Sequence, residues 1–221
     1  MNFSEPLLKI ENLGRQLPNH WIWRNINFSI QAGAKVAVLG PSGSGKTLFL
    51  RVLAGLDNAQ EGEIFFQGLS LSQWKMPQFR SQVIYLSQNP ALLEGTVEKN
   101  LQYVYRFSIY RDQHYNRQRI LDFLSLLGRS SSFLKRAVHE LSGGESQIVV
   151  FLRALQLAPS LLFFDEPSAS LDRESASGLE TLVSTWQAEN EQRSYFWTSH
   201  DPSQLDRMTD QELLLEGVDG K

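Results

Sequence analysis

The chain has 221 residues, of which 42% are apolar and 20% charged, so it can bury a core and has an ordinary globular composition. Its net charge of −3 provides no overall basic field, and nucleic acid is not an expected partner. Cysteine is absent from the sequence, which excludes disulfides and thiolate metal sites. The N-terminus has an early Glu5 and no long apolar stretch, so no secretory signal is expected, and the apolar runs are too short to span a bilayer.

The first third of the chain predicts strands around one helix. Short apolar runs bounded by glycine or polar turns are typical of strands, and they cover 7–13, 26–30, 35–40, 61–68 and 81–87. The segment 47–56 has the apolar spacing of a helix, which stops near Gly55.

The middle of the chain changes to helical patterns, at 96–107, 118–128 and 145–158. The α/β alternation then returns, with strands in 160–167, 194–200 and 212–217 and a helix over 173–192. Two α/β portions that flank a helical block predict one nucleotide-binding domain over 1–221. Its core would be 1–88 and 159–221, with a helical insert at 89–158.

The sequence GPSGSGKT matches the phosphate-loop pattern G-x-x-x-x-G-K-[ST] and stands between a predicted strand and a predicted helix. Its glycines let successive backbone N–H groups point at phosphate oxygens, and the helix adds its dipole. Lys46 supplies a charge for the β- and γ-phosphates, and the Thr47 hydroxyl is placed to ligate Mg²⁺. The expected nucleotide contacts here are Gly40, Pro41, Ser42, Gly43, Ser44, Gly45, Lys46, Thr47 and Leu48.

Two carboxylates follow the apolar run LLFF. Asp165 at the end of a buried strand beside a phosphate loop suits a hold on Mg²⁺. Glu166 points to the other side because strand side chains alternate, which suits a residue that orients or deprotonates the attacking water. The alternative is a strand-end turn without function, and the phosphate loop in the same chain weakens it.

A second loop of the anion-binding kind opens the helix at 145–158. With GPSGSGKT, this LSGGE loop and FFDEP in that order, the chain resembles the nucleotide-binding subunit of ABC (ATP-binding cassette) transporters over essentially its whole length. The resemblance implies an α/β P-loop NTPase (RecA-like) core with an antiparallel β subdomain and an inserted α-helical subdomain. It also implies an ATPase that uses ATP and Mg²⁺.

The resemblance further implies that two cassettes close head to tail, each laying its LSGGE on the ATP held by the other. The residues implied for this contact are Ser142, Gly143, Gly144, Glu145 and, in the loop that touches the facing subunit, Asp172. On this interpretation LSGGE is a half-site for a nucleotide on another chain, and the protein is incomplete as a monomer.

Other family positions can be matched one at a time. Gln88 matches a glutamine that contacts the metal and the attacking water, and His200 matches a histidine that contacts the γ-phosphate. The implied catalytic residues are therefore Lys46, Gln88, Glu166 and His200. The implied metal contacts are Thr47, Gln88 and Asp165.

Three positions depart from the family pattern. The aromatic residue that stacks on adenine would fall near Leu17, so Trp21 or Trp23 is the candidate for stacking, and packing is the alternative for either. Leu48 replaces a second Thr after the phosphate loop. Ile148 stands where a basic residue usually follows the signature, and the sequence gives no physical reason for that change.

The stretch after Gln88 is similar to export-type cassettes, and the chain is short, with no regulatory tail expected. This favours a stand-alone bacterial cassette of the iron-export type, acting as a homodimer on the cytoplasmic face of the inner membrane through a separate permease. Tyr103, Tyr105 and Phe107 are candidates for the permease dock or for a helix-packing stripe. The alternatives are an ABC ATPase without a permease, such as a cluster-assembly factor, and a regulatory module that barely hydrolyses ATP.

Overall fold

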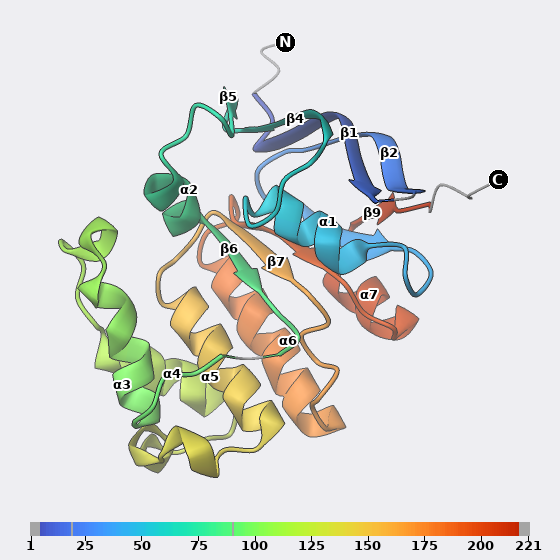
Figure 1. The fold of residues 1–221 in the computed structure, drawn as a ribbon. Coiled ribbons are helices and arrows are strands. Elements are labelled where there is room, and N and C mark those ends of the chain that lie inside the picture. The colour runs from blue at the N-terminus through green and yellow to red at the C-terminus, as the bar shows by residue number, and fades with distance from the viewer. Residues whose placement is uncertain (1–4, 19, 90, 217–221) are drawn as a thin grey trace.

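The computed structural model describes residues 5–18, 20–89 and 91–216, and it contains two sheets (Figure 1). The first sheet is antiparallel, with strand order β2-β1-β4-β5. Its strands are β1 (Leu8–Leu17), β2 (His20–Ile30), β4 (Glu61–Phe66) and β5 (Leu69–Ser70). Leu8 pairs with Ile30 on one side and with Phe66 on the other, which fixes the register.

The second sheet is parallel, with strand order β6-β7-β8-β3-β9. Its strands are β3 (Lys35–Leu39), β6 (Val83–Leu86), β7 (Leu161–Phe164), β8 (Ser194–Trp197) and β9 (Gln211–Leu214). All four residues of β7 and all four of β8 are buried, as expected of strands covered on both faces.

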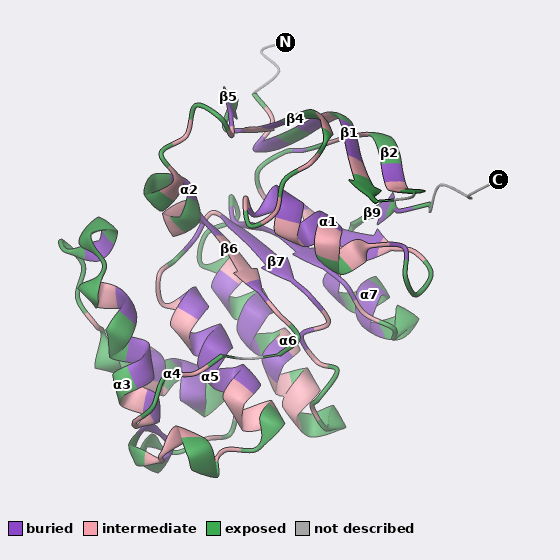
Figure 2. Ribbon diagram, in the orientation of Figure 1, coloured by how far each residue is buried: buried purple, intermediate pink, exposed green. Residues whose placement is uncertain are grey.

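Helices and the antiparallel sheet cover the two faces of the parallel sheet (Figures 1 and 2). The helices are α1 (Lys46–Leu53), α2 (Met76–Gln82), α3 (Val97–Tyr103), α4 (Arg117–Leu126), α5 (Gly143–Leu155), α6 (Arg173–Ala188) and α7 (Pro202–Met208). Short 3₁₀ turns stand at Val104–Arg106, Ser108–Tyr110, Ser131–Lys135 and Val138–Glu140. The described elements between β6 and β7 are thus helical.

Strand alternation divides the interior into two cores. Phe163 of β7 and Phe196 of β8 face α1 and the antiparallel sheet. Phe164 and Trp197, one residue further on, face the core formed with α4, α5 and α6. The parallel sheet is therefore a middle layer, and the loops at the ends of β3, β6, β7 and β8 meet along one edge.

The predicted fold class is confirmed, and most predicted elements are present. Two helices of seven residues, α2 and α7, had no sequence prediction. The predicted helix 96–107 ends at Tyr103 and continues as 3₁₀ turns. The predicted last strand reaches Leu214, and Gly217 at its predicted end lies outside the described residues. Among the described residues, no helix combines the length and apolarity that crossing a membrane requires.

Candidate functional site

The loop GPSGSGKT joins β3 to α1 and curls around a hollow. Gly40 and Gly45 have φ of +151° and +84°, and a Cβ atom on Gly45 would lie 2.5 Å from Cγ2 of Ile22. Only glycine combines that backbone conformation with so close an approach. In the described part of the chain, the buried hydroxyl of Ser44 has no hydrogen-bond partner. The loop therefore has the curled backbone and an unused polar group that suit a phosphate.

The hollow over this loop has a volume of about 440 Å³. It is lined by Ser42, Gly43, Gly45, Lys46, Thr47, Leu48, Arg51, Glu166 and His200. Residues from the first quarter of the chain thus meet two residues that follow β7 and β8. Nζ of Lys46 donates hydrogen bonds to the carbonyl oxygens of Gly40 and Pro41, at 2.8 and 3.1 Å, so the ammonium group already lies within the loop.

Asp165 is buried directly after β7 and accepts hydrogen bonds from three hydroxyl groups. The Thr47 hydroxyl lies 3.1 Å from Oδ1, the Thr198 hydroxyl 3.3 Å from the same atom, and the Tyr85 hydroxyl 2.8 Å from Oδ2. Burial, and then the hydrogen bond to Asp165 and its charge, raise the pKa of Tyr85, which keeps this donor protonated. Thr47 and Asp165 bring oxygen donors of the kind that Mg²⁺ prefers to one point at the loop.

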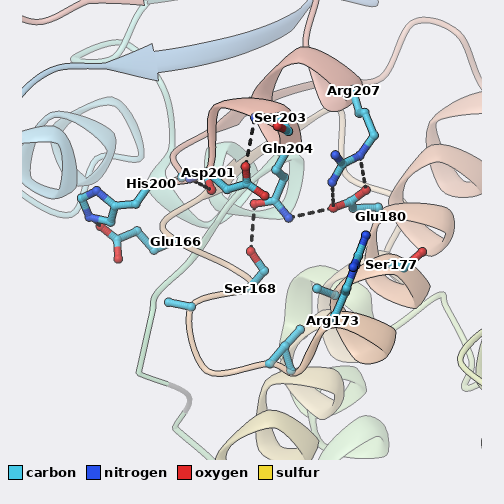
Figure 3. Close-up of a pocket in the computed structure, with 14 residues that line it drawn as sticks. Glu166, Ser168, Arg173, Ser177, Glu180, His200, Asp201, Ser203, Gln204 and Arg207 are labelled. Atoms are coloured by element: carbon cyan, nitrogen blue, oxygen red, sulfur yellow. Dashed lines mark hydrogen bonds and ion pairs between the residues drawn. The ribbon is translucent and has the colours of Figure 1, made fainter.

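Glu166 is held at both carboxylate oxygens and at its backbone. Nε2 of Gln88 donates to Oε2 at 3.0 Å, and Nε2 of His200 lies 2.9 Å from Oε1 (Figure 3). The backbone N–H of Glu166 donates to the Thr198 hydroxyl at 2.8 Å. Its φ of +48° is unusual for a residue with a side chain and costs on the order of 1 kcal/mol. The neighbouring contacts offset that strain and aim the carboxylate into the hollow.

The LSGGE loop begins α5 with a complete capping box. The Ser142 hydroxyl accepts from the Glu145 N–H at 3.2 Å, and Oε2 of Glu145 accepts from the Ser142 N–H at 3.0 Å. Arg136 and Arg129 form ion pairs with Oε1 of Glu145. Burial favours the neutral form of Glu145, but the Ser142 hydrogen bond and the two arginines outweigh it and lower the pKa of the carboxyl.

Two of the expected nucleotide contacts also cap helices in their own chain, and their contact with a nucleotide on a facing copy stays a prediction. The Glu145 carboxylate is turned toward Ser142, Arg136 and Arg129, so it holds the loop in place rather than projecting from it. The Asp172 carboxylate is the N-cap of α6 and accepts from the N–H and hydroxyl of Ser175, at 2.8 and 3.1 Å. These hydrogen bonds also lower the pKa of Asp172. Asp172, Ser142 and Gly143 are all exposed, whereas Glu145 is half-buried.

The aromatic candidates for adenine stacking lie away from the hollow. Trp21 is not among the described residues that line the hollow. One face of its ring is covered by the Arg24 guanidinium, whose carbon lies 4.5 Å from the ring centroid. Trp23 is fully buried and packs edge-on against Phe49 of α1, so it supports the loop from below. The structure therefore favours packing over stacking for Trp23, and adenine stacking by Trp21 stays a prediction.

The departure at Ile148 has a physical reason. Its side chain is 1% exposed and belongs to the core formed by α4, α5, α6 and the parallel sheet. An apolar residue suits that position, and a basic residue would need a partner there. Leu48, the other departure, does line the hollow.

Tyr85 and Thr198 were missed from sequence because only the sheet brings them beside Asp165.

Comparison with known proteins gives the family. A sequence model of the family described as ABC transporter matches residues 23–169. The probable iron export ATP-binding protein FetA of Escherichia coli is 32% identical over 98% of this chain and 94% of its own length. The molybdenum import ATP-binding protein ModC of Albidiferax ferrireducens is 34% identical over 86% of this chain and 52% of its own length.

Solved structures of low identity share the fold. A bacterial Atm1-family ABC exporter with ATP bound superposes with a TM-score of 0.82 at 22% identity, over 98% of this chain and 38% of that one. The cbiO1 protein of Clostridium perfringens, part of the ABC transporter complex cbiONQ, gives 0.79 at 22% identity, over 96% and 85%.

This chain belongs to the ABC transporter family, whose ATP-binding proteins are ATPases. In that family ATP-binding subunits bind ATP and work as dimers with membrane permeases.

Proposed function

We propose that the chain is the ATP-hydrolysing subunit of a bacterial exporter, with ATP and Mg²⁺ bound in the hollow over residues 40–48. The observation that carries this proposal is the meeting of the phosphate loop with Glu166 and His200 around one hollow of about 440 Å³. A phosphate loop alone binds nucleotide, whereas a carboxylate and an imidazole beside it also supply what hydrolysis needs.

The loop backbone and Lys46 bind the phosphates. With nucleotide present, Nζ of Lys46 would exchange its contacts with the Gly40 and Pro41 carbonyls for phosphate oxygens. Thr47 and Asp165 would hold Mg²⁺, and the Gln88 amide oxygen would face it. Bound Mg²⁺ would neutralise charge that develops on the phosphates. Tyr85 and Thr198 keep the Asp165 carboxylate oriented for this task.

Glu166 acts as the general base for the attacking water. Gln88 and His200 occupy its two oxygens, so the water enters by replacing or bridging one of these contacts. His200 is two-thirds exposed and lines the hollow, which leaves it free to turn toward the γ-phosphate.

A second copy of the chain completes the site. Among the described residues, those lining the hollow include none of 141–145, although Ser142 and Gly143 are exposed at the N-terminus of α5. That helix end presents free backbone N–H groups and a partial positive charge. Each copy would lay this end against the γ-phosphate held by the other, as a homodimer.

The permease would dock beside α3, on the cytoplasmic face of the membrane. A hollow of about 410 Å³ lies there, lined by Leu93, Glu94, Lys99, Asn100, Gln102, Tyr103 and Arg106. Leu93, Tyr103 and Phe107 are 44%, 38% and 52% exposed, and the rings of Tyr103 and Phe107 lie 5.8 Å apart, so apolar surface gathers at this place. Tyr105 is half-buried, with its hydroxyl directed to Gln156, and is better explained by packing.

The export direction and the iron-type substrate find support in the similarity to FetA, which covers 98% of this chain and 94% of that protein. The relatives ModC and FbpC 1, named as importers, are matched over 52% and 60% of their own length, and CysA of Chlorella vulgaris, also named as an importer, over 86%. Purification of the tagged full chain from its own membranes tests the proposal. We expect a multi-span membrane protein to co-purify and ATP turnover to accompany efflux of iron from cells or vesicles. Recovery of soluble partners alone would overturn the transport function, and inward movement of the solute would overturn the direction.

A further inference from the structure

A second hollow, of about 840 Å³, lies on the far side of Glu166 and His200 from the phosphate loop (Figure 3). Its walls are the segment 168–171, α6 and α7. Among the described residues, Glu166 and His200 are the two that line both this hollow and the hollow over the phosphate loop. Hydrogen bonds and ion pairs between the walls of this second hollow therefore also fix the positions of the Glu166 and His200 side chains.

Gln204 of α7 lies at the centre of these walls and is 3% exposed. Its Oε1 accepts hydrogen bonds from the Ser168 hydroxyl at 2.8 Å and from Nε1 of Trp197 at 3.3 Å. Its Nε2 donates to Oε1 of Glu180 at 2.9 Å. The orientation of the amide is fixed by chemistry, because the Trp197 indole can only donate and an ionised Glu180 can only accept.

Glu180 of α6 also binds a second residue of α7. Arg207 donates to both of its carboxylate oxygens, at 3.0 and 3.1 Å, in the two-bond geometry that suits a guanidinium and a carboxylate. The Gln204 network therefore comprises Ser168, Glu180, Trp197, Gln204 and Arg207, and it joins β8, the segment after Glu166, α6 and α7.

The network spans the two chain segments that carry the proposed catalytic pair. Ser168 follows Glu166 by two residues, and Gln204 follows His200 by four, with Asp201 capping α7 between them through the Ser203 N–H at 3.0 Å. At the other end of the same two segments, Glu166 and His200 approach to 2.9 Å.

We propose that Gln204 is a positioning residue for ATP hydrolysis, which holds the segment after His200 against the segment after Glu166. This inference rests on the roles proposed above for Glu166 and His200. Gln204 touches neither the nucleotide hollow nor the phosphate loop, so it acts on the rate of the chemical step rather than on ATP binding.

The test changes the charges of the two residues joined by the hydrogen bond between Gln204 and Glu180. Gln204→Glu places a second carboxylate about 2.9 Å from Glu180, where two like charges repel. Adding Glu180→Gln restores the net charge and a donor facing an acceptor, now in the opposite sense, but it removes one of the two hydrogen bonds from Arg207. Gln211→Glu makes the same charge change at an exposed position at the start of β9 and is the matched control. Ser168→Ala removes one donor without any charge change, and it carries the test if Gln204→Glu does not fold.

For the full chain, we expect Gln204→Glu to lower kcat about tenfold, with KM for ATP changed less than about twofold. The double variant should be faster than Gln204→Glu but slower than the parent, because it lacks one Arg207 hydrogen bond. The Gln211→Glu control should match the parent, and Ser168→Ala should lower kcat about threefold. A merely structural Gln204 would lower the melting temperature and leave kcat per folded molecule unchanged.

Parent-like kcat in Gln204→Glu, or in Ser168→Ala if the former does not fold, overturns the inference. Glu166→Gln in the same assay distinguishes a failure of the proposed catalytic site from a failure of the positioning role of Gln204. If Glu166→Gln retains turnover, the proposed catalytic site is wrong. If it loses turnover and the Gln204 variants do not, only the positioning role is wrong.

Discussion

Oε1 of Glu166 lies 2.9 Å from Nε2 of His200, while the other carboxylate oxygen accepts a hydrogen bond from Gln88. These two neighbours come from the ends of different strands, β8 and β6, so the carboxylate joins three segments that are far apart in the sequence. With both oxygens engaged, the carboxylate is held in place before any water arrives. Catalysis then requires a rearrangement of one contact, which closure of two copies around ATP would supply.

Replacing Glu166 with Gln should remove the general base and preserve the shape of the site. We expect ATP turnover to fall about 10²- to 10⁴-fold, the range typical of a lost general base. ATP binding should be retained, because Lys46 and the loop backbone are unchanged. The bound nucleotide should then hold two copies together, which size-exclusion chromatography with light scattering would detect.

The exposed Glu174 of α6 is a suitable control for this variant, because Glu174→Gln makes the same change away from the hollow. It should leave turnover and oligomeric state as in the parent. Parent-like turnover in Glu166→Gln would show that another group activates the water.

Ser142 separates two roles that one loop performs. Its hydroxyl caps α5, so Ser142→Ala should cost about 1 kcal/mol in the free energy of unfolding and leave the surface open for a second copy. Ser142→Arg also loses the cap, but it adds a bulky cation at the exposed helix N-terminus. We expect Ser142→Arg to bind ATP as a monomer and to lose dimer formation and turnover, with the Ala variant as the control for loss of the hydroxyl. Normal turnover in the Arg variant would contradict the shared site.

The strands and the phosphate loop could be predicted from the sequence because their signals are local. Runs such as LLFF and YFW are continuously apolar since both faces of β7 and β8 are covered. The helices α2 and α7 are only seven residues long, too short for a clear apolar period.

The partners of Asp165 were harder to predict, because Tyr85 and Thr198 reach it across neighbouring strands. The capping role of Glu145 had a sequence signal, since Ser142 and Glu145 have the spacing of a capping box. The contact of this loop with a nucleotide on another copy stays a prediction that rests on the family resemblance. The reason for Ile148 lay in the packing of α5, which a linear sequence does not display.

Removing the Tyr85 hydroxyl should weaken Mg²⁺ binding although no proposed metal ligand is replaced. Tyr85→Phe takes away the 2.8 Å hydrogen bond to Oδ2 of Asp165 and leaves the ring in place. Loss of such a supporting contact typically costs about tenfold in metal affinity. We expect a Mg²⁺ titration of the ATP-bound chain to show that shift, and turnover to recover at high Mg²⁺. Tyr110→Phe, at a buried tyrosine of the helical part, should shift neither, and an unchanged Mg²⁺ affinity in Tyr85→Phe would contradict the supporting role.

Glu145 predicts a pH dependence of stability. Its pKa in the folded chain is lowered from the ordinary value of 4.5, because hydrogen bonding by Ser142 and Arg136 and the charges of Arg136 and Arg129 outweigh burial. A carboxyl with a lowered folded pKa contributes stability above its unfolded pKa, and that contribution is lost as pH falls through the folded value. At neutral pH, Glu145→Gln should therefore be less stable by about 2 kcal/mol, the scale of hydrogen bonds to charged groups.

Chemical denaturation of Glu145→Gln and the parent at several pH values measures this contribution. Between pH 6 and 8 the difference should be constant, because Glu145 is ionised in both the folded and the unfolded chain there. Below about pH 4.5 the unfolded carboxyl takes up its proton first, so the difference should shrink. Glu63→Gln, at an exposed position of β4, should differ little from the parent throughout. A difference for Glu145→Gln that persists unchanged into acid would mean that its packing, and not its charge, holds the LSGGE loop.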